Sequence, residues 1–267
     1  MTSDKIIDMT ALVGLYGTLR PHPWIAANAD PQDAYSLFRV HATAMGWSAS
    51  GPDGIGATVW GMNDAGQAGS GEERRIGWFQ VGLDKTEGAL PLVPLAVCAW
   101  KSLARIGMMD VDAVQLLVPV HEAAPAWTHL VSTRSWFTTA DPAARVHAEV
   151  VLDPGADETG EQTSAAVVNG MQAISIKPFA VAPVPDRRPV ANLACEPALV
   201  GDLWMGPTRN PITLDAELPE WTPEAIGWLT SLVTEGMNKA GITTSTLISI
   251  VRQPFPGAGE GSPPAGG

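Results

Sequence analysis

Hydrophobic and polar residues alternate along many short stretches of this chain, a pattern typical of half-buried β-strands. In residues 35–47, for example, Val40 and Ala42 fall on one face while Arg39 and His41 fall on the other. Strands are also predicted over residues 6–19, 55–62, 75–83, 114–120, 129–138, 145–152, 166–176, 212–218 and 247–251. Of these, 6–19 is apolar-rich, and 114–120 is a continuous apolar run that suits a buried central strand.

Two longer stretches instead place apolar residues three and four positions apart, which predicts helices. The first covers residues 90–106 and is followed by Gly107, a residue at which helices commonly stop. The second begins after Thr222, with Pro223 at the first helical position and Glu224 in the first turn, where proline and acidic residues are favoured. The sequence therefore predicts one long helix in each half of the chain.

Part of the pattern occurs twice. Residues 39–42 (Arg-Val-His-Ala) return as residues 145–148, and residues 56–62 return more loosely as residues 165–171. Because these matches keep their order along the chain, they predict a tandem duplication. If it is real, the segments around Arg39 and Arg145 occupy equivalent places in the fold.

The duplication sets the expected architecture. We expect an α+β fold in which a mostly antiparallel sheet carries one long helix per repeat, the repeats being related by a pseudo-two-fold axis. Repeat 1 covers residues 1–122 and repeat 2 residues 123–253, with a Pro-rich insertion at 177–210. The glycine- and proline-rich tail, residues 254–267, is expected to be disordered.

Composition narrows the class of partner. Of the 267 residues, 45% are hydrophobic and 16% are charged, as in globular proteins, and the net charge is −12. Lysine and arginine cluster only in pairs, which disfavours nucleic acid and anionic membranes as partners. No apolar run reaches the roughly 18 residues of a membrane helix, so a soluble, cytoplasmic protein is expected. Cys98 and Cys195 are too few for a disulfide framework.

The recognisable motifs of catalysis are missing from the sequence. There is no phosphate-binding loop, no dinucleotide fingerprint, no His-Glu-x-x-His and no Gly-x-Ser-x-Gly. Histidines and cysteines do not show the spacing of metal ligands. We therefore expect neither a metal nor a cofactor, and the sequence leaves open whether there is any catalytic activity.

Two sets of candidate site residues follow from the duplication. His41 and His147 could converge near the pseudo-axis as metal ligands or as an acid/base pair, although a solvated polar face is the favoured interpretation. Arg20 with Trp24, matched by Arg134 with Trp136, could form stacked sites for a carboxylate or another anion. Alternatively, each arginine holds its own turn by bonding to a backbone carbonyl.

The Pro-rich insertion supplies one more candidate, Trp204, which lies between Leu203 and Met205 and could anchor the segment. Long connections are often functional. We expect this one to pack over the sheet or over the crevice between the repeats and to form part of the functional surface.

Two functions remain open. The favoured one is a non-enzymatic binding or assembly protein that acts on a protein partner or on itself, since few lysines protect its strand edges. The alternative is a small-molecule enzyme with an apolar, Trp-lined pocket between the repeats, which could also take a small apolar ligand. The positions of the ten tryptophans discriminate between the two functions. In an enzyme with such a pocket the tryptophans would surround one cavity, whereas in a binding protein they would be dispersed.

Overall fold

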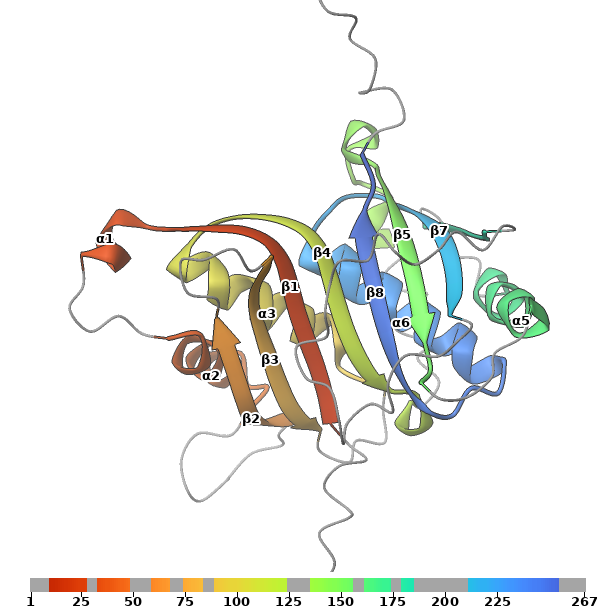
Figure 1. Ribbon diagram of the computed structural model, residues 1–267, viewed down its shortest axis with the longest axis horizontal. Helices are drawn as coiled ribbons and strands as arrows, with labels where there is room; N and C mark the ends of the chain where they lie inside the picture. Colours follow the sequence, from red (N-terminus) through yellow and green to blue (C-terminus); the bar gives the residue numbers. More distant parts are fainter. Residues whose placement is uncertain are drawn as a thin grey trace, which may run out of the picture.

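The strands of the protein form one antiparallel sheet of eight, in the order β2-β3-β1-β4-β8-β5-β7-β6 (Figure 1). The strands are β1 (Thr10–Pro21), β2 (Trp60–Gln67), β3 (Arg75–Leu83), β4 (Gly107–Pro119), β5 (Val146–Asp153), β6 (Ala180–Pro183), β7 (Ile212–Leu218) and β8 (Ser245–Arg252). The helices are α1 (Pro23–Ala26), α2 (Ala34–Ala44), α3 (Leu92–Ile106), α5 (Glu161–Gln172) and α6 (Pro223–Lys239). This computed structural model describes residues 10–27, 33–48, 59–67, 74–83, 89–123, 135–155, 161–173, 179–184 and 211–254.

The four longer helices cover one face of the sheet. They lie side by side in the order α2-α3-α6-α5, behind the strands in Figure 1. Helices α3 and α6 approach closely at Gly227, where a β carbon would lie 2.6 Å from the Cα atom of Val93. Glycine is therefore needed there to bring the two central helices together.

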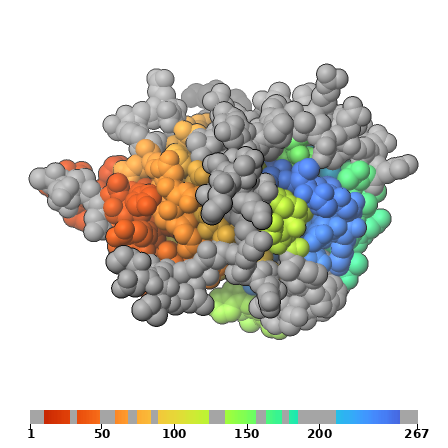
Figure 2. Space-filling view, turned by 90° about the horizontal axis from the view of Figure 1, so that it is seen from below, coloured from red at the N-terminus to blue at the C-terminus, as the bar shows by residue number. Residues whose placement is uncertain are grey.

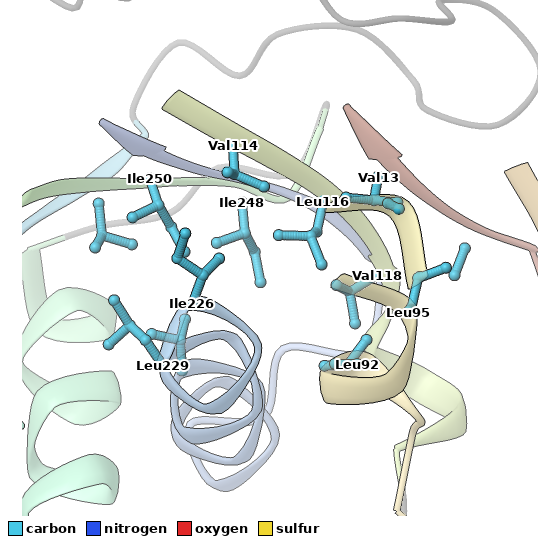
Figure 3. Packing of buried hydrophobic residues seen from close by; sticks show 14 of the residues in the cluster. Val13, Leu92, Leu95, Val114, Leu116, Val118, Ile226, Leu229, Ile248 and Ile250 are labelled. Atoms are coloured by element: carbon cyan, nitrogen blue, oxygen red, sulfur yellow. The ribbon is translucent and has the colours of Figure 1, made fainter. Parts of the chain in front are cut away.

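The hydrophobic core lies between these helices and the sheet. Every second strand residue points toward the helices, as the strand period of two requires. Figure 3 shows the centre of this layer, where α3 and α6 face strands β1, β4 and β8. The labelled side chains are Val13, Leu92, Leu95, Val114, Leu116, Val118, Ile226, Leu229, Ile248 and Ile250. The predicted α+β class is confirmed.

Helix α2 corrects the prediction of a strand over residues 35–47. Asp33 caps the helix, because its carboxylate accepts a backbone hydrogen bond from the first turn at 2.8 Å. Phe38 and Ala42, four residues apart, are buried, whereas Val40 is 57% exposed. Over so short a stretch the alternation fits a helix as well, and the cap together with the buried i, i+4 pair decides between them.

Helix α5 corrects a second predicted strand, at residues 166–176. Val167, Val168 and Met171 are buried at helical spacing, and α5 packs against α6. The described residues 135–137 are also helical, so the strand predicted over 129–138 is wrong where it can be compared. Each half of the chain thus has a second helix in place of a strand.

The other predicted elements are confirmed, with shifted ends in most cases. Strands β3 and β7 and the end of α3 before Gly107 agree with prediction. Thr222 caps α6, its hydroxyl accepting a hydrogen bond from the backbone N of Ala225 at 3.3 Å. Residues 6–9, 55–58, 185–210 and 255–267 lie outside the described residues. The predicted insertion at 177–210 contains the edge strand β6.

The sequence matches behind the predicted duplication do not fall on equivalent elements. Residues 39–42 belong to α2, whereas residues 145–148 lead into β5; residues 60–62 belong to β2, whereas residues 165–171 belong to α5. The prediction that the Arg39 and Arg145 segments are equivalent is therefore wrong. An identity of four residues can arise by chance. Here one copy is helical and the other extended, so the identity does not mark equivalent positions in the fold.

The order of elements nevertheless repeats along the chain. With short helices set aside, it runs β1-α2-β2-β3-α3-β4 and then β5-α5-β6-β7-α6-β8. Each run is a βαββαβ unit, the split βαβ arrangement. From the central β4–β8 pair, the sheet reads β4-β1-β3-β2 in one direction and β8-β5-β7-β6 in the other. Figure 2 shows the two runs side by side, with the N-terminal segment (red and orange) at one end and the C-terminal segment (blue and green) at the other.

Candidate functional site

The sheet has a second face, opposite α2, α3, α5 and α6, whose residues can be read from the strand pairing. Directly opposed residues of antiparallel strands point to the same side. One row across this face runs Trp78, Gly14, Gln115, Ser249 and Val151, from β3 through β1, β4 and β8 to β5. The row crosses the β4–β8 seam, where the two βαββαβ runs meet.

A buried chain of hydrogen bonds spans this seam. The hydroxyl of Tyr16 donates to Oε1 of Gln115 at 2.6 Å, and Nε2 of Gln115 donates to the hydroxyl of Ser249 at 3.0 Å. All three side chains are buried. Three strands from the two runs are thus joined by side chains as well as by backbone, and we call this set the seam network (Tyr16, Gln115, Ser249). Networks of this kind specify one arrangement of neighbouring elements.

Gly14 makes the seam network possible. It lies two residues before Tyr16 on the same face, and a β carbon there would lie 3.3 Å from Cε2 and 3.4 Å from the hydroxyl of Tyr16. The aromatic ring therefore lies over the glycine, which lets its hydroxyl reach β4. A larger residue at position 14 would push the ring away from Gln115.

The second face changes character between the seam and the strands β5 and β7. Around the seam it is apolar, with a buried cluster of Leu12, Leu117 and Leu247 against Trp78. On β5 and β7 it is charged: Glu149 lies opposite Asp215, and His147 lies opposite Glu217. Arg145 forms an ion pair with Glu217.

A second feature is the ribbon in which β1 and β4 continue past their neighbours. β3 pairs with β1 only as far as Tyr16, and β8 pairs with β4 only from Ala113. Beyond these points Gly17–Pro21 pairs with Gly107–Val111 as a two-stranded ribbon. At its base the backbone N of Gly17 donates to the carbonyl of Arg74, and Nε1 of Trp221 donates to the carbonyl of Val111, each at 2.7 Å. A β carbon on Gly17, whose φ is +147°, would collide with the carbonyl of Asp110, and one on Gly107 would collide with that of Arg20. The ribbon thus depends on two glycines.

The end of the ribbon carries exposed apolar side chains, and contacts of His22 with the end of α3 hold it in place. The backbone N of His22 donates to the carbonyl of Ile106 at 2.9 Å, and its Nε2 lies 3.1 Å from the carbonyl of Ala104. Trp24, on α1, stacks on the His22 ring with centroids 4.3 Å apart, yet is 66% exposed. Met108 on the facing strand is 65% exposed. We call Arg20, His22, Trp24 and Met108 the ribbon tip.

His41 belongs to an aromatic cluster beneath α2 rather than to a polar face. Its ring meets Trp47 edge-on at 5.7 Å, and Trp47 lies 5.6 Å from Trp60. Burial lowers the pKa of His41, and the charges of Arg105 and Lys101 lower it further, while the Cys98 carbonyl acts in the opposite direction. These surroundings therefore favour the neutral form of the ring over the charged form.

Cys98 lies beside this cluster. Its thiol donates to the carbonyl of Phe38 at 3.5 Å, and burial raises its pKa to about 12. A reactive thiol needs an accessible site that favours the thiolate. Cys98 is therefore a small buried core residue rather than a reactive thiol. Cys195 lies outside the described residues.

The structure does not bring the predicted site residues together. Arg20 and Trp24 share the ribbon tip, but Trp136, 69% exposed, belongs to the helical residues 135–137 before β5, far from α1 (Figure 1). His41 lies on α2, which packs against β2 at one edge of the sheet, whereas His147 lies on β5, beyond the central β4–β8 pair. The structure therefore does not bring the two histidines together. The favoured interpretation, a solvated polar face, fits His147, which is exposed, but not His41, which belongs to the aromatic cluster. The other candidates, Arg134 and Trp204, lie outside the described residues.

Further observations concern metals and membranes. In the described part of the chain, no three His, Cys, Asp or Glu side chains gather as a metal site would require. Among the described helices, none combines the length and the apolar composition that crossing a membrane demands.

Sequence reasoning overlooked the seam network, although it leaves a signal. Gln115 is the one polar residue in the apolar stretch 113–118 of β4, and a buried amide requires hydrogen-bonding partners. Its partners could not be identified from sequence, because Tyr16 and Ser249 lie 99 and 134 residues away.

Comparison with known proteins assigns the chain to no family. No family model, curated protein or solved structure matches the chain.

Proposed function

We propose that this protein acts by binding or assembly rather than by catalysis, and that the ribbon tip is its contact surface. The observation that carries the proposal is Trp24, which is mostly exposed although the His22 ring holds it in place. An exposed tryptophan that is already ordered loses little entropy when a partner covers it. Tryptophan is accordingly enriched among the residues that dominate protein interfaces.

The positions of the tryptophans support binding over an enclosed Trp-lined pocket. In the described part of the chain they are dispersed among the ribbon tip, the cluster beneath α2, the second face, the helical layer and residues 135–137. These are Trp24, Trp47, Trp60, Trp78, Trp100, Trp136, Trp221 and Trp228.

The test compares two equally exposed tryptophans. Tagged wild-type protein, Trp24→Ala and Trp136→Ala are each used to capture proteins from an extract of cells that express the chain, with quantitative mass spectrometry as the measurement. We expect Trp24→Ala to reduce specific capture by about tenfold or more, as loss of an interface anchor does. Trp136→Ala is the matched control and should capture as the wild type does. Equal loss in both variants would indicate general stickiness of exposed tryptophan and would contradict the proposal.

We also infer that the two βαββαβ runs arose by duplication and are related by a pseudo-two-fold axis near the β4–β8 pair. The repeated order of elements and the mirrored order of strands support this inference. The equivalent elements are then β1 with β5, α2 with α5 and α3 with α6, not the segments matched by sequence. Superposition of the two runs tests it: if Cα atoms of the paired elements do not superpose within a few ångströms, the duplication is rejected.

One observation favours a second function, binding of a small molecule at the seam. Tyr16, Gln115 and Ser249 place hydroxyl and amide groups among apolar side chains between the two runs. Such a mixture is typical of small-molecule sites. A thermal-shift screen with small hydroxyl- or amide-bearing apolar compounds tests this. A true ligand would raise the melting temperature of the wild type and leave that of Gln115→Leu unchanged.

A further inference from the structure

The two halves of the chain carry similar net charge. Residues 1–123 include eight Lys or Arg and thirteen Asp or Glu, 8 − 13 = −5, and residues 124–267 include eight Lys or Arg and fifteen Asp or Glu, 8 − 15 = −7. Within the described residues, however, exposed charges of each sign gather locally. Local groups of opposite sign favour contacts in which one surface of a molecule meets a different surface of a second copy.

The positive charges gather next to the ribbon tip. Arg20 lies on the ribbon opposite Met108, and Lys101 and Arg105 lie in the last turns of α3, whose Ala104 carbonyl meets His22. Arg39 lies on α2, which packs against α3. All four are exposed, and none forms an ion pair with another described residue. We call Arg20, Arg39, Lys101 and Arg105 the basic end.

The negative charges include an unfavourable pair on the second face. Glu149 on β5 lies directly opposite Asp215 on β7, and neither carboxylate forms an ion pair with a described residue. Like charges directly opposite each other on neighbouring strands destabilise a sheet. A cation brought to this pair would relieve the repulsion. We call Glu149 and Asp215 the acidic pair.

We propose that the protein self-associates, with the basic end and ribbon tip of one copy docking on the acidic pair of a second copy. Charge complementarity selects a second copy as the occupant, because guanidinium groups match carboxylates in geometry as well as in sign. Trp24 and Met108 supply the apolar anchor beside these charges. The contact is heterologous, so two of them close a dimer or successive copies form a ring or a chain. The inference rests on the proposed function, which assigns the same tip to binding.

Sedimentation velocity of the full chain tests the proposal. We expect concentration-dependent association at about 0.05 M salt and a dissociation constant at least about tenfold higher at about 0.5 M salt, because salt screens exposed charges. The double variants Arg20→Glu/Arg105→Glu and Glu149→Lys/Asp215→Lys should each remain monomeric. Their equimolar mixture should associate again, since each variant retains the surface that the other has lost.

A matched control distinguishes the effect of this contact on association from the effect of net charge. Glu122→Lys/Asp141→Lys changes the charge as much as Glu149→Lys/Asp215→Lys does, at exposed residues outside both surfaces, and should associate at least as well as the wild type. Circular dichroism and thermal melting of every variant confirm that monomers are folded.

The outcomes distinguish the two proposals. A wild type that is monomeric at all concentrations and salts overturns self-association, as does a mixture of folded charge variants that stays monomeric. If the wild type is monomeric but still captures other proteins through Trp24, self-association fails while the proposed function stands. If capture does not depend on Trp24 but the charge variants restore each other, the assignment of the tip as the anchor fails.

Discussion

The centre of the second face and its β5–β7 side share the same antiparallel backbone arrangement but differ in chemistry. Around the seam, Tyr16, Gln115 and Ser249 are buried and bonded to one another. On β5 and β7, Glu149 and Asp215 face each other with the same charge. The centre uses its polar groups to hold strands together, whereas the β5–β7 side tolerates an unfavourable pair. The comparison teaches that the sheet sets where side chains lie, while the choice of side chain sets what each surface can do.

The ribbon sharpens the comparison between the two runs. β1 and β4 pair over Leu12–Pro21, whereas β5 and β8 pair over Ala148–Asp153. Only the first pair continues beyond its neighbours into a ribbon, and Gly17 and Gly107 permit this by allowing close backbone approach.

The largest expected effect comes from breaking the ribbon. Gly17→Val places a β-branched side chain at a φ of +147° and against the Asp110 carbonyl. We expect the free energy of unfolding to fall by about 3 kcal/mol or more, measured by urea denaturation. Gly46→Val is the control, since Gly46 also has a positive φ but no atom within 4 Å of its β-carbon position. Equal losses in the two variants would show that close approach at the ribbon does not matter.

The next effect concerns the seam network. Gln115→Ala removes the partner that links Tyr16 to Ser249 in a buried setting, so we expect a loss of about 2–4 kcal/mol in the free energy of unfolding. The same measurement on Glu149→Ala should show almost no loss. If both variants lost the same amount, the contrast between the centre of the face and its β5–β7 side would be wrong.

A smaller effect is expected from pH. The folded-state pKa of His41 lies below its ordinary value of 6.5, mainly through burial. Between the two pKa values the unfolded chain binds a proton that the folded chain does not, so stability falls as pH drops from about 6.5 to the lowered folded pKa. Denaturation at a series of pH values should show this decline, and His41→Gln should reduce it. An unchanged decline in the variant would assign the pH dependence to other groups.

The smallest effect should be a gain. Asp215→Asn removes the charge that opposes Glu149, and we expect the free energy of unfolding to rise by up to about 0.5 kcal/mol at low salt. The gain should shrink when salt is added, because the repulsion is then screened. A loss of stability at low salt would mean that Asp215 has a favourable partner in the folded protein.

Local signals were sufficient where one pattern had one interpretation. Thr222-Pro223-Glu224 predicted the start of α6, and Gly107 predicted the end of α3, because caps and helix stops depend on a few adjacent residues. The strand β3 was predicted with its bounds. The site fared less well: Trp24 and Arg20 are placed together, whereas His41 and His147 are not, because the sequence match that joined them equated a helix with a strand.

What the sequence alone determined, then, is the α+β class, the two central helices and most strands, since periodicity and caps are written in neighbouring residues. Only the tertiary structure decided that residues 34–44 form a helix, because the burial of Phe38 depends on Phe79, stacked at 4.8 Å, and on Trp60. It also decided the strand order and the seam network. Gln115 could find Tyr16 and Ser249 only after β1, β4 and β8 became neighbours, and pairing across such separations follows from packing the whole sheet rather than from any local pattern.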